Sequence, residues 1–257
     1  MADLIKAQLY QLKKGRILFV FCVLMAVQAA LMLGEFNENA SFTVSEYLAE
    51  SMFMMVCTAF VFAAAAAGEI CCADFNDRTA NYEIMAGHTR REIYLSRVVL
   101  SLITGTVGTH ILMVLPIITG SCIWGFGTAL SAGKVALRLV LLIFPAMRFT
   151  AEFVFIGYII KNSYITTAIG FFYAFYGGML IDIWGKPRSV LLSIINALRI
   201  SYFDFYQTYS AIDLKNYYVY ESGISCGLVL QTITASIIFG GVFLYLGYLF
   251  FKKDDMR

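Results

Sequence analysis

The stretch GEICCADFNDRTANYEIMAGHTRREIYLSR, residues 68–97, is a charged segment between two long apolar runs. It carries five acidic and four basic side chains, whereas residues 52–67 before it and 98–124 after it contain no Asp, Glu, Lys or Arg. Apolar runs of this kind are typical of membrane-spanning helices. They would hold both ends of the charged segment at one face of a membrane, where it can present a surface to a soluble partner.

The whole chain has the composition of a membrane protein rather than of a soluble domain. Of its 257 residues, 60% are hydrophobic and only 14% are charged, well away from the usual globular balance. The net charge of +2 arises mainly from Lys and Arg at the ends of apolar runs, where membrane orientation requires them. We therefore expect membrane lipid, and no nucleic acid, as a partner. The six cysteines show no CxxC motif and no Cys/His spacing suited to zinc, so we expect no metal site.

These features predict an all-α integral membrane protein with a single transmembrane domain over residues 1–257. The six expected spans cover residues 17–33, 52–70, 98–124, 135–160, 164–183 and 224–251. Residues 1–14 have an apolar and a basic side, which predicts an amphipathic helix in the membrane interface. An ordinary basic flank of the first span is the alternative. In the external segment 184–223, residues 189–199 are apolar but too short to cross, which predicts a re-entrant or interfacial helix before span six.

The distribution of basic residues orients these spans. The loop 34–50 carries four glutamates and no Lys or Arg, so the positive-inside rule places it outside and the N-terminus in the cytoplasm. With alternating spans, twelve Lys and Arg side chains fall inside and six fall outside. We therefore predict a multi-pass membrane protein with cytoplasmic N- and C-termini.

Small residues and prolines indicate how the spans pack. Residues 63–68 are five alanines and a glycine, a surface on which another helix can approach closely. Pro116 predicts a kink in the third span. Span four holds Pro145, Arg148 and Glu152.

The chain lacks the motifs of an enzyme that works alone. No HExxH, GxSxG or paired-carboxylate motif sits where an intramembrane enzyme could use it. The nearest match to a phosphate-binding loop, residues 127–134, has five residues between its glycines instead of four, is followed by Val135, and is expected outside. We therefore expect no enzymatic activity and no cofactor in this chain, so that any dependence on ATP must come from another subunit.

Residues 74–97 carry a resemblance to a known family. An acidic segment with Asp74 and Asp77 leads into YEIMAGHTRR, residues 82–91, and Ile93, Tyr94 and Arg97 then run into the next span. This resembles the first cytoplasmic loop of the type-2 permeases of ATP-binding-cassette (ABC) exporters. The usual pattern there is an acidic stretch, an apolar turn, a Gly, a Ser/Thr-Arg pair, then an apolar and a basic residue. The six spans, the basic N-terminal helix and the segment before the last span resemble that family too.

The resemblance implies that residues 81–92 form a coupling helix that docks on an ATPase. Its apolar anchors would be Tyr82, Ile84 and Met85, and its charged rim would be Glu83, Arg90 and Arg91. The partners would be two ABC ATPase subunits, which bind ATP and Mg, and a second permease copy or a similar permease. The small permeases that export or expel bacteriocins and other amphipathic peptides are the most similar, so the substrate would be such a peptide or a lipid-like or drug-like molecule. The alternative is a solvated loop whose arginines only fix the topology.

Arg148 and Glu152 are four residues apart on one helix face and can pair. An unpaired Arg in mid-membrane costs about 2.5–3.5 kcal/mol on insertion scales, so a pose against lipid is disfavoured. Two interpretations stay open: a charged spot on the translocation path or at a gate, and a structural pair that ties span four to its neighbours. Cys122 and Cys226 both fall near the outer face, but the sequence does not fix the distance that a disulfide would need.

Two rival functions come from other classes. A non-ABC secondary transporter would be expected to show repeated halves with ionisable residues at matched positions, and Arg148 and Glu152 have no counterpart in the other half of the chain. A structural or sensory membrane subunit without transport is the second rival. A neighbouring reading frame with a GxxxxGK[ST] motif would favour the exporter over both.

Overall fold

The computed structural model describes residues 2–38, 43–77, 83–128, 131–183 and 226–253. These residues form helices and connecting turns, and no strand occurs among them. Tyr82 and the external segment 184–223 lie outside the described residues, so the interfacial helix expected there stays a prediction.

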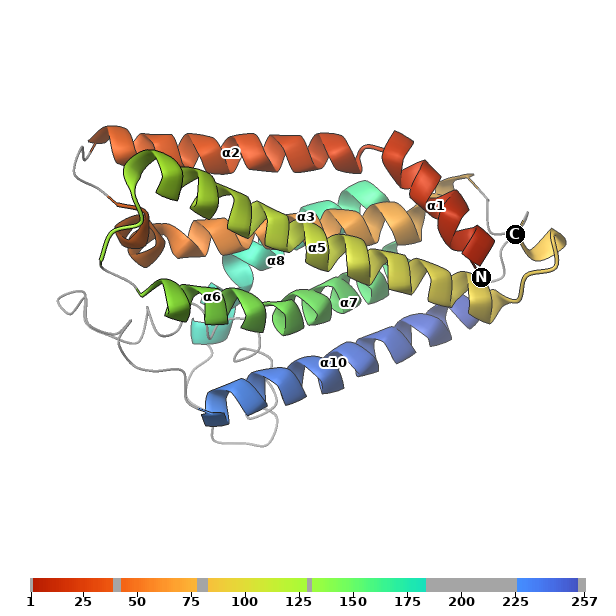
Figure 1. Ribbon diagram of the computed structural model, residues 1–257. Helices are drawn as coiled ribbons and strands as arrows, with labels where there is room; N and C mark the ends of the chain where they lie inside the picture. Colours follow the sequence, from red (N-terminus) through yellow and green to blue (C-terminus); the bar gives the residue numbers. More distant parts are fainter. Residues whose placement is uncertain (1, 39–42, 78–82, 129–130, 184–225, 254–257) are drawn as a thin grey trace.

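The helices follow the apolar runs of the sequence (Figure 1). They are α1 Ala2–Lys14, α2 Ile17–Glu38, α3 Val44–Asp77, α5 Arg90–Trp124, α6 Ala132–Leu141, α7 Ile143–Ile160, α8 Ser163–Ile183 and α10 Cys226–Lys253. Among the described residues, five stretches are long and apolar enough to cross a membrane: Ile17–Asn37, Met55–Cys72, Arg90–Trp124, Ala132–Ile160 and Thr232–Lys253. The chain is therefore an all-helical protein with the character of a multi-pass membrane protein, as predicted. α8 occupies the expected fifth span, 164–183, but is not among these five.

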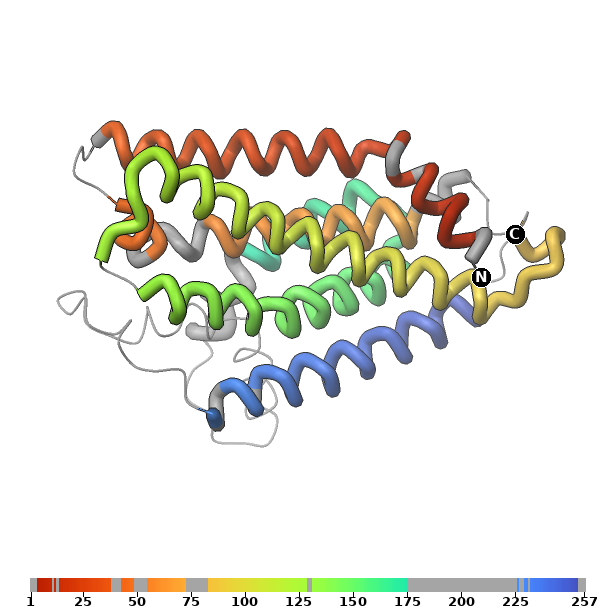
Figure 2. The backbone as a smooth tube through the Cα atoms, in the orientation of Figure 1, coloured from red at the N-terminus to blue at the C-terminus, as the bar shows by residue number. Residues whose placement is uncertain are grey.

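α3 forms the centre of the bundle. Its apolar stretch is almost wholly buried, whereas those of α2 and α10 are mostly exposed. α3 packs against α2, α5, α7 and α8, and α10 packs mainly along α7. Figure 2 shows α2 and α10 on opposite sides of this arrangement. The exposed side chains of α2 are those expected against lipid, such as Phe19 and Leu33.

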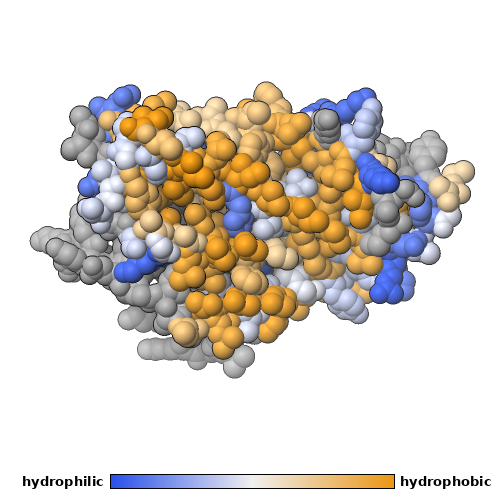
Figure 3. All heavy atoms as spheres, viewed as in Figure 1, coloured by the Kyte–Doolittle hydropathy of each residue, from blue (hydrophilic) through white to orange (hydrophobic). Residues whose placement is uncertain are grey.

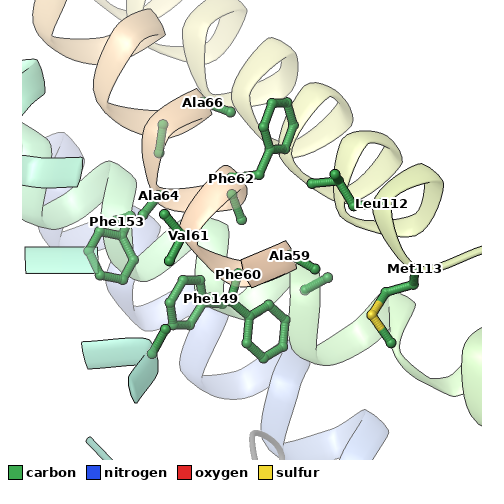
Figure 4. Close-up of a cluster of buried hydrophobic side chains, with 14 of the residues drawn as sticks. Ala59, Phe60, Val61, Phe62, Ala64, Ala66, Leu112, Met113, Phe149 and Phe153 are labelled. Atoms are coloured by element: carbon green, nitrogen blue, oxygen red, sulfur yellow. The ribbon is translucent and has the colours of Figure 1, made fainter. Parts of the chain in front are cut away.

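Small side chains let the neighbours of α3 come close, as the alanine run predicts. A Cβ added at Gly170 of α8 would lie 2.2 Å from the Cβ of Ala64, and one at Gly108 of α5 would lie 1.9 Å from a ring carbon of Phe62. On α3, the ring of Phe60 stacks on that of Phe149 of α7, with centroids 4.7 Å apart (Figure 4). Since lipid tails are as apolar as the side chains, such close packing is what holds helices together in a membrane.

The expected fourth span, 135–160, is not one helix but two. α6 ends at Leu141 and α7 begins at Ile143. Pro145 has no N–H to give to the Leu141 carbonyl, and its ring crowds that carbonyl, so the helix is interrupted one turn before the proline. The Leu142 N–H bonds to the Arg138 carbonyl at 2.9 Å, which closes the last turn of α6. By contrast, α5 continues through Pro116.

The ends of the bundle have different neighbours. α1, the turn that begins at residue 83 and the end of α10 lie together at one end, and the starts of α6 and α10 lie at the other (Figure 1). The contact of α1 with α5 includes a hydrogen bond of 3.3 Å from Gln8 Nε2 to Ser96 Oγ. The N-terminal helix and the end of α10 are therefore at the same end, as the expected topology requires.

Candidate functional site

The segment expected to dock on a partner is a turn between helices. α3 continues to Asp77 and α5 already begins at Arg90, so the expected coupling loop 71–97 is shorter at both ends. Of the described residues between α3 and α5, 83–85 are helical and 86–89 are not. The expectation of one coupling helix over 81–92 is therefore wrong for residues 83–92, because Gly87 and Thr89 end one helix and start the next.

Gly87 ends the short helix in a left-handed conformation, with φ 93°. Its N–H bonds to the Ile84 carbonyl at 3.0 Å, and the N–H of His88 bonds to the Glu83 carbonyl at 3.2 Å. These two bonds are the Schellman arrangement, in which a glycine past the helix end satisfies the last carbonyls. A residue with a Cβ would be strained at this φ.

Thr89 starts α5 through a capping box with Glu92. The Thr89 side chain accepts a bond of 3.3 Å from the Glu92 N–H, and the Glu92 carboxylate accepts one of 2.9 Å from the Thr89 N–H. Thr-x-x-Glu before an apolar run is a known signal for a helix start. The signal was present in the sequence, and we interpreted these residues only as part of the family pattern.

The expected docking residues point in different directions. Met85 is 82% exposed, whereas Ile84 is half-buried and packs against the core. Glu83 pairs with the buried Arg97 at 2.8 Å, so it belongs to an internal ion pair rather than to a free charged rim. Through this pair, Arg97 ties the turn to α5. Tyr82 lies outside the described residues.

Arg90 and Arg91 are exposed at the start of α5. Arg90 Nη1 donates a bond of 3.2 Å to the Lys252 carbonyl in the last turn of α10, the place where a cation is favourable at a helix end. One turn further, the Tyr94 hydroxyl donates to the Leu244 carbonyl of α10, and its ring contacts Tyr158, Tyr248 and Phe251. The start of α5 is therefore fixed to both α7 and α10.

The second candidate is the ion pair inside the bundle. Arg148 Nη1 lies 3.3 Å from Glu152 Oε1 on α7, with side chains 0% and 6% exposed, so the expected pairing is present. Tyr173 of α8 also hydrogen-bonds the Glu152 carboxylate. The pair thus links α7 to α8. A buried charge pair of this kind is strongly destabilised when one partner is removed.

Aromatic rings and a glycine surround this pair. The rings of Phe149 and Phe153 lie 5.6 and 6.0 Å from that of Tyr173, centroid to centroid. On the other side, a Cβ added at Gly240 of α10 would lie 3.7 Å from the Arg148 Cα. In this conformation the ion pair is buried between helices. A substrate could reach it only if α7, α8 or α10 moved.

Several further polar contacts cross the apolar core and were missed in the sequence. Gln28 of α2 donates to Thr58 Oγ1 at 2.6 Å, and Thr109 of α5 donates to the Ala59 carbonyl at 3.2 Å. Arg138, counted as an outer charge, is buried. Such contacts hold membrane helices together, but single polar residues in apolar runs carry no signal of which helix they will meet.

Metal and disulfide sites are not formed among the described residues. No group of three or more His, Cys, Asp or Glu side chains is arranged there to hold a metal ion. Cys122 and Cys226 are exposed and free, so the disulfide left open by the sequence is not present.

Comparison with known proteins yields no relative. No family model matches the chain, and no curated protein or solved structure is significantly similar to it. The resemblance to ABC exporter permeases therefore stays an expectation drawn from the sequence.

Proposed function

We propose that this chain is the permease subunit of an ABC exporter in the bacterial cell membrane. It would move an amphipathic peptide or a lipid-like or drug-like molecule out of the cytoplasm. Two separate ATPase subunits would bind ATP and Mg, and a second permease copy or a similar permease would complete the transporter. The proposal includes α8 as a sixth span and cytoplasmic termini. The observation that carries it is the exposed Met85 on a rigidly held turn.

Three sets of contacts fix the turn around Met85 relative to α5. The Schellman bonds at Gly87 and the capping box at Thr89 fix its backbone, and the Glu83–Arg97 pair ties its short helix to α5. One exposed methionine alone would be ordinary for a protein surface. On a turn this rigid, however, a force applied at Met85 is passed to α5 as a rigid-body movement instead of being absorbed by a flexible loop.

The contacts of α5 supply a route into the membrane. Arg90 and Tyr94 bond to carbonyls of α10, and α10 packs along α7, which carries Arg148 and Glu152. A partner that displaced the turn would thus move three helices together. This is the coupling that an exporter driven by a separate ATPase requires.

Charge supports the orientation that the proposal needs. Exposed basic side chains gather at the end of the bundle with the turn, on α1, before α2, at the start of α5, after α7 and at the end of α10: Lys6, Lys14, Arg16, Arg90, Arg91, Lys161, Lys252 and Lys253. A basic end is typical of the cytoplasmic side. The docking surface would then face the compartment that contains ATP.

The test is a pull-down with the cognate ATPase, with Met85→Asp as the variant. Aspartate would place a charge in the apolar pocket that receives Met85, and the expected cost is about 2–4 kcal/mol of docking, as for a central anchor. Both co-purified ATPase and substrate-stimulated ATP hydrolysis should fall. Lys253→Glu is the matched control, an exposed change at the same end that leaves the turn intact.

Two results would contradict the proposal. Normal docking and turnover with Met85→Asp would make the turn a simple connector between spans. ATP hydrolysis by the purified chain alone, or no association of the unaltered chain with any ATPase, would favour a non-ABC membrane protein instead.

A further inference from the structure

α6 and α7 are two parts of one apolar stretch, Ala132–Ile160, that is longer than a membrane requires. Its 29 residues would make a straight helix of about 43 Å, against a hydrocarbon core of about 30 Å. A long stretch of this kind adapts by tilting or kinking. Here it is interrupted at Leu142, and Pro145 removes the hydrogen bond that would have made the junction stiff. The chain therefore has a joint between α6 and α7.

His110 of α5 is placed against the last turn of α6. Its Nδ1 lies 2.7 Å from the Thr106 carbonyl of α5, and its Nε2 lies 3.1 Å from the Leu139 carbonyl of α6. A neutral imidazole has one N–H and donates to only one of these oxygens at a time. The hydrogen bond from His110 to the Leu139 carbonyl of α6 therefore competes with the one to the Thr106 carbonyl of α5. Losing the bond to α6 costs little, because the ring can donate to Thr106 instead.

α6 buries only one of its sides against the rest of the bundle. Leu137 and Val140 are 51% and 59% exposed, whereas Val135, Arg138 and Leu141 make up its buried side. The hydroxyl of Thr106, on α5 near His110, is buried with no hydrogen-bond partner among the described residues. An unsatisfied hydroxyl penalises the packed arrangement. Figure 3 shows a hydrophilic spot in the apolar face between α5 and the junction of α6 with α7.

We propose that α6 is a gate that swings away from α5 about the Leu142 joint, and that the His110 bond to the Leu139 carbonyl is its latch. In the closed state the ring lies within hydrogen-bond distance of both carbonyls, and its proton is exchanged between the bond to α6 and the bond inside α5. In the open state it donates from Nδ1 to the Thr106 carbonyl, and the Thr106 hydroxyl becomes accessible. The gate is a motion of this chain alone, so it does not depend on the proposed function.

The experiment measures the distance between α5 and α6 in the full chain, reconstituted in lipid nanodiscs. Spin labels are attached to cysteines at Val107 and Leu137, which are both exposed, after the exposed Cys22, Cys122 and Cys226 have been changed to serine. The unaltered latch should give a main distance and a minor longer one. His110→Ala should raise the ratio of long to short distances about fivefold, as expected for the loss of one ordinary hydrogen bond.

Two further variants separate the latch from the joint. His110→Gln keeps a donor that can reach the Leu139 carbonyl, so it should restore the short distance. Pro145→Ala allows a continuous helix and should narrow the distribution to one distance. Thr119→Ala is the control, since Thr119 bonds only to carbonyls of its own helix and its loss should change nothing.

Either of two outcomes would overturn the proposal. One is a distance distribution that is the same in His110→Ala as in the unaltered chain. The other is a Pro145→Ala distribution as broad as the parent. If His110→Ala does not fold, His110→Gln still decides the matter, because a longer main distance in that variant would show that the ring does not act as a latch.

Discussion

Arg97 and Arg148 are both buried arginines, and each lies within ion-pair distance of one carboxylate. Arg97 reaches Glu83 at 2.8 Å across a turn, and Arg148 approaches Glu152 at 3.3 Å along one helix. The second pair could be predicted, because a spacing of four brings two side chains to the same helix face. The first could not, since fourteen residues and a glycine turn separate its partners and only the folded turn brings them together.

The first prediction concerns the pair inside the bundle. Arg148→Met should lower the unfolding free energy by about 3–5 kcal/mol, because Glu152 would stay buried without its cation. The double variant Arg148→Met/Glu152→Leu should lose much less than the sum of the single losses. Thermal unfolding of the purified variants in detergent is the measurement, and the exposed Arg91→Met is the control. Additive losses would show that the two side chains do not interact.

The second prediction concerns the start of α5. Thr89→Ala removes the side-chain cap on the first turn and should cost about 1 kcal/mol locally. Hydrogen exchange of the backbone amides from Arg91 to Ile93 should become faster, while exchange in the middle of α5 stays unchanged. Thr119→Ala removes a threonine of the same helix that caps nothing and should leave these amides as they were. Unchanged exchange in Thr89→Ala would mean that the capping box does not hold the turn.

At the scale of elements, hydropathy predicts where a helix lies in lipid but not where it ends. The second span was expected to end at residue 70, whereas α3 continues to Asp77. The third span was expected to begin at residue 98, whereas α5 begins at Arg90. Charged residues can continue a helix into water, and only local signals such as Gly87 and Thr89 end or start one. In the same way, the break at Leu142 depends on Pro145, a signal that was visible but was outweighed by the continuous apolar run.

The third prediction tests the close approach of α8 to α3. Gly170→Ala would put a Cβ 2.2 Å from that of Ala64, and neither backbone can yield without moving a helix. The expected cost is about 1–3 kcal/mol from overpacking. Gly241→Ala is the matched control, because nothing lies within 4 Å of its added Cβ and alanine favours a helix over glycine. If both variants unfold at the same temperature, α8 does not pack on α3 as described.

At the scale of the whole molecule, the sequence predicts how many apolar helices there are more readily than how they are arranged. The run of alanines at residues 63–67 did indicate close packing on α3. It did not indicate that α3 would lie at the centre, in contact with α2, α5, α7 and α8. That arrangement depends on complementary surfaces on α3 and on the four helices that pack against it. The residue pattern of one helix describes only its own surface and not the surface of the helix that it meets.

The last prediction is that α8 crosses the membrane and completes six spans. α8 runs antiparallel to α3: the Gly68 region meets Ser163, while Cys57 bonds to the Ala174 carbonyl. Because α3 contains an apolar stretch long enough to cross, a helix packed along it in this way should cross too. Residues 184–225 should then lie outside, and the ends of α1 and α10 inside.

Single cysteines in a background without reactive native thiols provide the measurement. In intact cells, a reagent that cannot pass the membrane should label cysteines at Lys134 and Ser193. Cysteines at Lys14 and Lys253 should react only after the cells are opened, because these residues belong to the basic end. If Ser193→Cys reacts only from the cytoplasmic side, after the cells are opened, while Lys134→Cys is labelled in intact cells, α8 does not cross. The proposed six-span permease would then be wrong even though the helices themselves are correctly placed.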